Sequence, residues 1–586
     1  MALLFDILGP EHRHPLLTEA VRRLAENDEV GRGAVFTKRA VVDALLNLLE
    51  YTPAQSLYQM RLLEPSFGNG DFLLPAIGRL LDAYQADGGT PDSAVQDLSQ
   101  SIRAVELHEL TFEDTSNRIM DRLREWGMSD SDAAQLVGTW LIHDDFLLAY
   151  FEEGFDVVVG NPPYVRQERI PDALLSEYRR RYLTLFDRAD LYVPFFERGL
   201  DLLKPGGGLG FICANRWLKN KYGGPLREKI ARGFHVAFYI DMEKADAFHS
   251  DVIAYPAITV IRRPIDRNNP LPTRVLAGKD IEVQLLPRIA DGMVTFEPSQ
   301  GNQVIEVVGV ASGKDPWLMD NPTQLPLLRR LEKELPRLEE TGCKVGIGVA
   351  TGVDHVFIGK YDELPVEESR KLPLVMAPDL ENGEILWRGH GVVNPFESDG
   401  RLAELGDYPK FRAFIERNRE AVARRHVAKK NPNSWYRTID RIYPEICFKQ
   451  KLLIPDIKGT ATVVRDPGQF YPHHNLYFVT SSDWDLEALQ AVLRSSVSIM
   501  FVAAYCIRMA GGFLRFQAQY LRRIRIPLWE NVGATLRERL VDVATEKNLE
   551  TVDNVVFDLF GLSPPDRLIV SKIAKEAQVQ PKGREQ

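Results

Sequence analysis

The sequence predicts an α/β fold in which helices cover both faces of a mostly parallel β-sheet. Short β-branched segments alternate with amphipathic stretches between about residues 30 and 265, which is the pattern of such a sheet. Turns rich in glycine, acidic residues or proline directly follow four of these segments, at the positions where open parallel sheets bind ligands. The candidate strands are residues 62–64, 102–106, 139–143, 155–159, 208–212, 236–240 and 258–261.

Length and composition indicate a globular protein of at least two domains. The chain has 586 residues, of which 45% are hydrophobic and 26% are charged. No apolar run approaches the roughly 18 residues of a membrane-spanning helix, and no secretion signal is recognisable, so we expect a cytoplasmic protein without membrane contact. The four cysteines form no C-x-x-C pair, which argues against a disulfide framework and a structural zinc site.

The first two turns carry glycine and acidic residues. A strand ends at Glu64 and leads into a turn that contains Gly68 and Gly70, where the backbone can approach a ligand closely. The same glycines also suit a tight strand-to-helix turn for purely steric reasons. Glu106 ends the next strand, and its carboxylate suits two ribose hydroxyls, although a solvated helix start is the alternative interpretation.

The third and fourth turns indicate recognition of planar groups. Asp144 or Asp145 could accept a hydrogen bond from an adenine amino group and Phe146 could stack on the ring, whereas helix capping is the alternative role of the two acids. The fourth turn is Asn161-Pro162-Pro163-Tyr164. Its two prolines fix the backbone and remove donors, so the loop presents carbonyl oxygens, an amide oxygen and a flat aromatic face. A structural Pro-Pro turn is the competing interpretation.

The succession of these turns resembles the S-adenosylmethionine-dependent amino-methyltransferases of DNA. The order, with cofactor motifs before the catalytic motif and target recognition last, is similar to their γ class and most closely to TaqI-like adenine-N6 enzymes of restriction-modification systems. The resemblance covers residues 31–265 and implies a Rossmann-like domain with a mostly parallel seven-stranded sheet. It also implies S-adenosylmethionine as the cofactor, and no metal.

The resemblance assigns cofactor contacts residue by residue. Phe36 and Thr37 match an aromatic-Thr-Pro element that folds over the methionine part of the cofactor, but Lys38 replaces the usual proline. The other implied contacts are Glu64, Gly68 and Gly70 at the methionine moiety, Glu106 at the ribose, and Asp145, with Asp144 as its rival, and Phe146 at the adenine.

The resemblance also implies a mechanism. The Asn161 side-chain oxygen and the Pro162 carbonyl would accept the two amino hydrogens of an adenine flipped out of the duplex, within the frame completed by Pro163. Tyr164 and Phe248 would hold the base by stacking. Cytosine C5 methylation needs a nucleophilic cysteine, and none lies near this loop. Cytosine N4 remains open, as do methylation of RNA or protein glutamine and a non-catalytic DNA-specificity subunit.

The second half carries the charge expected of a DNA-recognition domain. Residues 409–458 hold 13 Lys or Arg against 5 Asp or Glu, a net charge of +8 in a chain whose net charge is −10. A solvated helix face is the alternative explanation. The expected DNA contacts are Arg424, Arg425, Lys429, Lys430 and Arg437, together with Arg179, Arg180 and Arg181 after the catalytic loop.

These patterns divide the chain into an N-terminal helical segment (1–30), a methyltransferase domain (31–265), a connector (266–335), a mixed α/β target recognition domain (336–565) and a tail (566–586). We expect a site-specific adenine methyltransferase that acts on double-stranded DNA. Its biological partner would be a separately encoded restriction endonuclease, and the chain would act as a monomer associated with the nucleoid.

Overall fold

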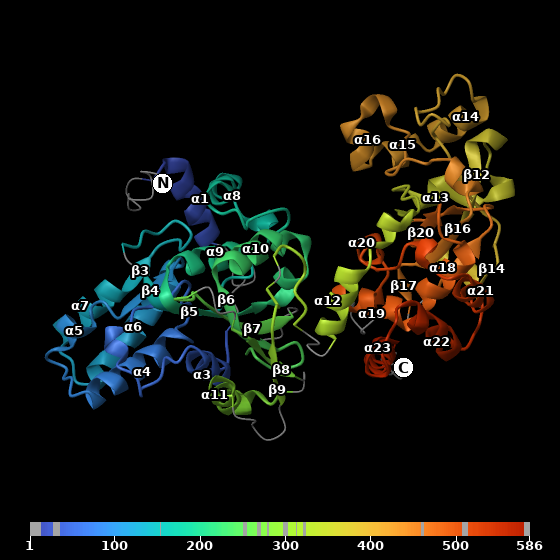
Figure 1. Cartoon of the computed structure of the whole chain (residues 1–586). Coiled ribbons are helices and arrows are strands. Elements are labelled where there is room, and N and C mark those ends of the chain that lie inside the picture. Colours follow the sequence, from blue (N-terminus) through green and yellow to red (C-terminus); the bar gives the residue numbers. More distant parts are fainter. Residues whose placement is uncertain are drawn as a thin grey trace, which may run out of the picture. The chain divides into compact units, whose positions relative to one another are not determined.

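The computed structural model divides the chain into two compact units, Met1–Pro322 and Thr323–Gln586, each of which is described by itself (Figure 1). It describes residues 13–26, 36–152, 154–249, 255–266, 271–277, 281–296, 303–311, 313–319, 324–381, 383–458, 462–506 and 514–578.

The described part of the first unit is built on one nine-stranded sheet, in the order β3-β2-β1-β4-β5-β7-β6-β8-β9. Strands β3, β2, β1, β4 and β5 are mutually parallel, whereas β7 is antiparallel to both β5 and β6. The bounds are β1 (Leu62–Glu64), β2 (Ile102–Glu106), β3 (Leu141–His143), β4 (Phe155–Gly160), β5 (Leu203–Ala214), β6 (His235–Asp241), β7 (Pro256–Arg262), β8 (Thr273–Ala277) and β9 (Gln303–Val307). The predicted α/β fold with a mostly parallel sheet is confirmed.

Helices cover both faces of this sheet. Neighbouring residues of a strand point to opposite faces. A Cβ added to Gly210 of β5 would meet Leu45 of α3, whereas Leu209 lies against Gly199 of α9, so α3 and α9 cover opposite faces. The helices are α1 (Pro15–Ala25), α3 (Arg39–Leu48), α4 (Leu73–Ala86), α5 (Ala94–Leu98), α6 (Glu109–Glu125), α7 (Asp130–Trp140), α8 (Asp172–Arg181), α9 (Tyr192–Asp201), α10 (Gly224–Gly233) and α11 (Leu286–Thr295).

The strand order reverses between β1 and β4, which places a switch point in the sheet. Both strands run in the same direction, with Leu62 paired to Val157 and Leu63 to Val158. Their carboxyl ends, Glu64 and Gly160, therefore lie side by side, and the helical connections leave a crevice there. This is where the first and fourth predicted turns meet.

Several boundaries differ from the predictions, and β5 begins five residues before the predicted strand 208–212. The segment 266–335 is not a mere connector, because β8 and β9 extend the sheet beyond the predicted seven strands and α11 packs on α3. Residues 566–586 are not simply a tail, since α23 (Pro564–Gln578) packs against α19. Strand β3 begins at Leu141 because the two residues before it end α7.

The described part of the second unit is mixed α/β, as predicted, with four-stranded sheets β10-β20-β16-β18 and β11-β15-β12-β19. Its strands are β10 (Cys343–Ile347), β11 (Ile358–Lys360), β12 (Lys371–Val375), β13 (Leu380–Glu381), β14 (Glu384–Ile385), β15 (His390–Val393), β16 (Lys451–Pro455), β17 (Ile457–Lys458), β18 (Val464–Asp466), β19 (Tyr471–Pro472), β20 (Leu476–Ser481) and β21 (Leu514–Arg515). Its helices are α12 (Leu325–Glu334), α13 (Asp354–Phe357), α14 (Pro409–Arg417), α15 (Arg419–Ala423), α16 (His426–Lys430), α17 (Glu445–Phe448), α18 (Leu486–Arg494), α19 (Ser496–Tyr505), α20 (Ala518–Leu521), α21 (Ala534–Asp542), α22 (Leu549–Leu559) and α23.

Buried contacts hold this unit together. The Nζ atom of Lys451 lies 2.7 Å from Asp466, and both side chains are fully buried. The same ammonium donates to the carbonyls of Ile446, Cys447 and Lys449, so the buried charge is fully hydrogen-bonded.

In the described residues no single helix has the length and hydropathy of a membrane span. Only the pair α18 and α19 meets both criteria jointly, and these two helices are bent by 59°.

Candidate active site

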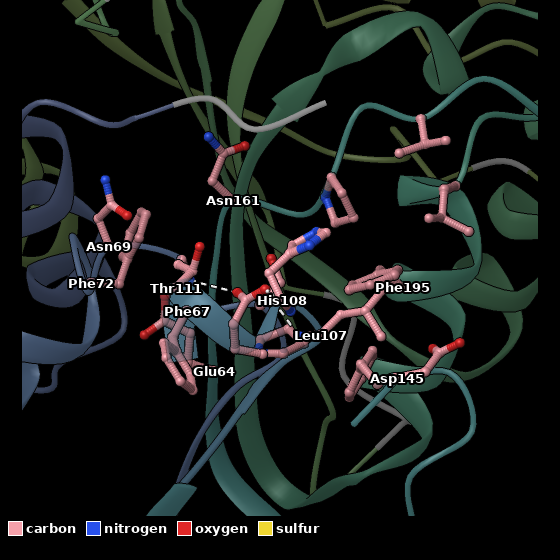
Figure 2. A pocket seen from close by; sticks show the side chains of 18 of the residues that line it. Glu64, Phe67, Asn69, Phe72, Leu107, His108, Thr111, Asp145, Asn161 and Phe195 are labelled. Carbon is pink, nitrogen blue, oxygen red and sulfur yellow. Dashed lines mark hydrogen bonds between the residues drawn. The ribbon is translucent and has the colours of Figure 1, made fainter. Parts of the chain in front are cut away.

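A cavity lies at the carboxyl ends of β1, β2 and β4, where the four predicted turns converge (Figure 2). Its walls combine carboxylates, backbone turns and aromatic rings. The sequence-predicted residues that line it are Phe36, Thr37, Glu64, Gly68, Glu106, Asp144, Asp145, Phe146, Asn161 and Pro163. Predicted residues that lie more than a hundred positions apart in the sequence therefore line one cavity.

The glycine turn after β1 adopts a backbone that favours glycine. Gly68 and Gly70 have φ values of +48° and +76°. A Cβ on Gly70 would lie 3.1 Å from Thr115 of α6, which leaves no free space there. Thr115 in turn donates from Oγ1 to the Gly68 carbonyl at 2.7 Å. The turn is thus packed from behind, and its Gly68 side faces the cavity.

The Glu106 carboxylate is held by the same turn. Oε2 accepts from the Gly68 amide at 2.8 Å, and Oε1 accepts from the amides of Leu107 and His108 at 2.9 Å. Three backbone donors therefore fix one carboxylate at the end of β2. Because each carboxylate oxygen has more than one acceptor direction, further donors from a ligand can still be accommodated.

Glu64 differs from Glu106 in its surroundings. Its side chain is only 1% exposed, and its buried Oε2 has no hydrogen-bond partner among the described residues. Burial raises the pKa of Glu64 well above its usual 4.5, and the neighbouring carboxylates of Asp71 and Glu106 raise it further. An unsatisfied buried carboxyl that faces a cavity is suited to a cationic or hydrogen-bond-donating ligand.

Asp71 was not predicted as a site residue, yet it links two predicted elements. It accepts from the Thr37 amide at 2.8 Å, while the Thr37 hydroxyl oxygen accepts from Asn161 Nδ2 at 3.2 Å. Burial raises the pKa of Asp71. Its position one residue after Gly70 in the turn was the signal that could have identified it.

Residues 36–38 are fixed on their other side by residues 247–249. The Lys38 amide donates to the Ala247 carbonyl at 3.1 Å, and the His249 amide donates to the Phe36 carbonyl at 3.1 Å. Phe248 pairs with Thr37 in a short antiparallel bridge. Its side chain is 7% exposed, packs in the hydrophobic core and does not line the cavity. The stacking role of Phe248 therefore stays a prediction that this arrangement does not favour.

The Asn161-Pro162-Pro163-Tyr164 loop leaves β4 at this crevice. Because Asn161 donates from Nδ2 to Thr37, its amide plane is oriented and its Oδ1 is the acceptor end. Pro162 is buried, Pro163 lines the cavity, and the half-buried Tyr164 ring lies 6.2 Å from the Tyr192 ring, measured between centroids. The loop is thus a rigid frame with polar oxygens and an aromatic face.

Asp144 and Asp145 both line the cavity but have different partners. Both Asp144 oxygens accept from the Arg13 guanidinium at 2.5 Å, so this carboxylate is neutralised by the segment before α1. Asp145 accepts from the Leu147 amide at 2.8 Å and from the Tyr178 hydroxyl, and burial raises its pKa. Next to them, the Phe146 ring packs 4.9 Å from Phe195, again between centroids.

The basic residues predicted to contact DNA fall into two groups. Arg425 is structural, because its guanidinium donates to the carbonyls of Val422, Thr351, Trp435 and Arg437. The prediction that Arg425 contacts DNA is therefore wrong, because these carbonyls occupy its guanidinium. Burial also lowers the pKa of Arg425. Arg424, Lys429 and Lys430 are exposed, although Arg424 also pairs with Glu420. This part of the basic segment is folded into three short helices, α14 to α16.

The remaining predicted contacts are partly occupied by the protein itself. Arg180 and Arg181 pair with Glu177 one turn earlier on α8, and Arg179 donates to Gln167 at 2.8 Å. Arg437 is half-buried. Such surface pairs are weak, so the pairing does not prevent an arginine from exchanging its partner for a phosphate.

Comparisons with known proteins agree on one class. Residues 80–248 match the family model of the Eco57I restriction-modification methylase. Over 557 residues the chain is 52% identical to the type II methyltransferase M.PaeR7I of Pseudomonas aeruginosa, covering 94% of this chain and 96% of that protein. It is 50% identical over 542 residues to M.XhoI of Xanthomonas vasicola, with coverages of 92% and 99%.

A solved structure shows the same fold at low identity. The type IIL restriction-modification enzyme MmeI, determined in complex with DNA, superposes with a TM-score of 0.54 at 12% identity, over 92% of this chain and 75% of that one. The first unit and the second unit of this chain thus share the fold of a restriction-modification enzyme. The near-complete matches are more specific: this chain belongs to the type II methyltransferase family and is a DNA methyltransferase. The resemblance drawn from the sequence is confirmed.

Proposed function

We propose that this enzyme transfers the methyl group of S-adenosylmethionine to the N6 atom of an adenine flipped out of double-stranded DNA. The observation that carries the proposal is the Asn161-Pro162-Pro163-Tyr164 loop at the switch point, with its amide oriented by Thr37 toward a cavity that contains an unsatisfied carboxyl. Loop and cavity lie at neighbouring strand ends, as a methyl donor and its acceptor require.

The residues of the cavity fit S-adenosylmethionine. This cofactor is cationic at sulfur and at its amino group, and when bound it supplies an electrophilic methyl group. The buried Glu64 carboxyl matches the cationic methionine end, and the carboxylate of Glu106 has acceptor directions for ribose hydroxyls. Asp145 and Phe146 line the same cavity, and we assign them as the acceptor and the aromatic surface for the cofactor's adenine.

Adenine's amino nitrogen is a weak nucleophile because its lone pair is delocalised into the ring. We assign the Asn161 Oδ1 atom and the Pro162 carbonyl as acceptors of its two amino hydrogens, which localises the lone pair and aims it at the methyl group. Tyr164 stacks on the flipped ring, an interaction worth about 1–3 kcal/mol per base. The base must leave the helix stack because its amino edge is otherwise out of reach.

Glu64 makes cofactor binding depend on pH. Its raised pKa keeps the carboxyl protonated above the pH at which a free glutamate ionises, whereas a cationic ligand favours the ionised form. The Kd for S-adenosylmethionine should therefore fall as pH rises through that range. Glu64→Gln should bind at least about 10-fold more weakly and with a flatter pH profile, measured by isothermal titration calorimetry.

Protein stability provides an independent check on the same group. Because the pKa of Glu64 is raised in the folded state, the free energy of unfolding should decrease as pH rises above the usual value of 4.5. Glu64→Gln removes this loss, so the variant should gain stability relative to wild type as pH rises. The matched control is Glu125→Gln on the exposed surface of α6. Equal pH profiles of S-adenosylmethionine binding for wild type and Glu64→Gln would contradict the assignment of Glu64 as a contact of the cationic cofactor.

The second unit is proposed to recognise DNA, with the exposed ends of α15 and α16 contacting phosphates. Replacing Lys429 and Lys430 together with alanine should reduce the slope of log Kd against log salt concentration by about 2, since each phosphate contact contributes roughly 0.9. Fluorescence anisotropy with duplex DNA measures this slope. Lys547→Ala, an exposed lysine outside the basic segment, is the control. An unchanged slope in the double variant would show that these lysines do not contact phosphates.

The nature of the modified base is tested on purified components. DNA incubated with the enzyme and S-adenosylmethionine is digested to nucleosides and separated by mass spectrometry. We expect N6-methyldeoxyadenosine. Detection of N4-methyldeoxycytidine instead would show that the target base is cytosine. The absence of any methylated nucleoside would indicate a non-catalytic specificity subunit. RNA and glutamine-containing peptides, tested in parallel, should not be methylated.

The biological setting is a further part of the proposal. We propose that the methylation protects cellular DNA from a separately encoded restriction endonuclease and that the enzyme acts as a monomer in the cytoplasm, at the nucleoid. Sedimentation should show the mass of one chain for the free protein, and the mass of one chain plus one duplex for its complex with DNA. A dimer in either state would reject the monomer.

A further inference from the structure

Three side chains with metal-binding chemistry converge in the second unit, outside the catalytic cavity. Asp354 begins α13, and His473 and His474 lie in the turn between β19 and β20. Among the described residues these are the group of three whose ligand atoms all lie within 4.8 Å of one another. Imidazole nitrogens and a carboxylate are ligands that zinc and similar divalent ions prefer, and three protein ligands are typical of a site that keeps a further position for water.

The backbone holds both histidines in place. The His473 amide donates to the Val375 carbonyl, and the His474 amide donates to the Val349 carbonyl, each at 3.0 Å. Asp354 is fixed as well, because its Oδ1 accepts from the Thr351 hydroxyl at 2.6 Å. The second oxygen, Oδ2, lies 3.4 Å from His473 Nε2. The ligands are therefore preorganised by their neighbours.

The buried His473 ring is oriented as in a metal site. It is 4% exposed, and its Nδ1 atom lies 2.9 Å from the side-chain oxygen of Asn475. An amide oxygen only accepts, so Nδ1 is the nitrogen that donates in this contact, and Nε2 is the ring nitrogen directed at Asp354. Metal-bound histidines are commonly held in this manner through their other nitrogen. His473 Nε2 and the Asp354 carboxylate therefore face each other, and the ligand atom of His474 lies beside them.

We propose that Asp354, His473 and His474 bind one divalent transition-metal ion of the zinc type. A shared proton would be enough to join Asp354 and His473, but His474 brings a third metal-ligand atom to the same point. The exposed side chains of Asp354 and His474 line a shallow surface pocket, where water completes the coordination. The ion fixes the loop 351–354, whose Thr351 carbonyl also anchors Arg425 of the basic segment.

The proposed metal site is separate from the methylation reaction, so the experiment measures metal binding directly. The tag-free full chain, stripped of metal, is titrated with Co²⁺ and followed by its visible d–d absorption, then displaced with Zn²⁺. We expect one equivalent to bind to wild type. Asp354→Asn and His474→Ala, both at exposed positions, should each bind at least about 100-fold more weakly, and Asn475→Ala about 10- to 100-fold more weakly.

The control is His426→Ala, which removes an exposed histidine of α16 and should leave Co²⁺ binding unchanged. Circular dichroism establishes that the variants are folded, and added Zn²⁺ should raise the melting temperature of wild type but not of His474→Ala. Absence of saturable binding by wild type, or binding that survives in both Asp354→Asn and His474→Ala, would overturn the proposal.

Discussion

Replacing Asn161 with alanine is expected to lower kcat for DNA methylation by at least about 100-fold, which is the loss seen when one preorganised polar group at a reacting centre is removed. The amide is held by Thr37 at the rim of the cavity, so its removal deletes an acceptor for the substrate amino group. The carboxylates of Glu64 and Glu106, which we propose as cofactor contacts, stay in place. The Kd for S-adenosylmethionine should therefore change by no more than about 3-fold.

Two comparisons make this result specific. Asn531→Ala removes an exposed surface amide and should methylate like wild type. Single-turnover kinetics on a DNA duplex measure the chemical step, and calorimetry measures cofactor binding. Methylation by Asn161→Ala close to the wild-type rate would remove Asn161 from the acceptor role. Loss of cofactor binding together with methylation would instead assign the residue to the cofactor side of the cavity.

Replacing Glu106 with alanine should damage both the cofactor site and the fold around it. Three backbone amides that now donate to one carboxylate would lose their acceptor. An unsatisfied buried donor costs about 1–3 kcal/mol, and water entering the cavity compensates in part, so we expect a loss of roughly 2–5 kcal/mol in the free energy of unfolding. Because the Gly68 turn loses its support, the Kd for S-adenosylmethionine should rise at least about 100-fold.

Urea unfolding measures the change in the free energy of unfolding, and calorimetric titration measures the change in the Kd for S-adenosylmethionine. Glu109→Ala is a close control, since Glu109 is an exposed acid in the first turn of α6, where the helix dipole favours a negative charge. Its effect should stay below about 1 kcal/mol. If Glu106→Ala retains wild-type cofactor affinity, Glu106 serves the turn alone and does not contact the ribose.

Local patterns explain why much of the site was predictable. Glu64 and Glu106 each end a short apolar strand and Asn161 directly follows one, and parallel strands place their carboxyl ends at the same edge of a sheet. The chain positions of the strands therefore determined which residues would meet. Gly70 was recognisable for a related reason, since its positive φ and its packing against Thr115 are demands of the turn itself.

What the sequence concealed depends on contacts between distant residues. The role of Arg425 is set partly by the Thr351 carbonyl, 74 residues away, and a surface charge pattern cannot reveal such a partner. Strands β8 and β9 were missed because short segments between breakers become strands only by pairing with each other and with β6. Helix α23 was taken for a tail, although Val570, Ile573 and Ala577 follow the spacing of a buried helix face.

The most direct measurement of the central claim is single-molecule sequencing of DNA from cells that express this enzyme, beside cells that express Asn161→Ala. We expect methylated adenine at one defined sequence context in the first DNA and at background level in the second. Modified cytosine at that context, or no modified base at any context from a folded enzyme supplied with S-adenosylmethionine, would contradict it.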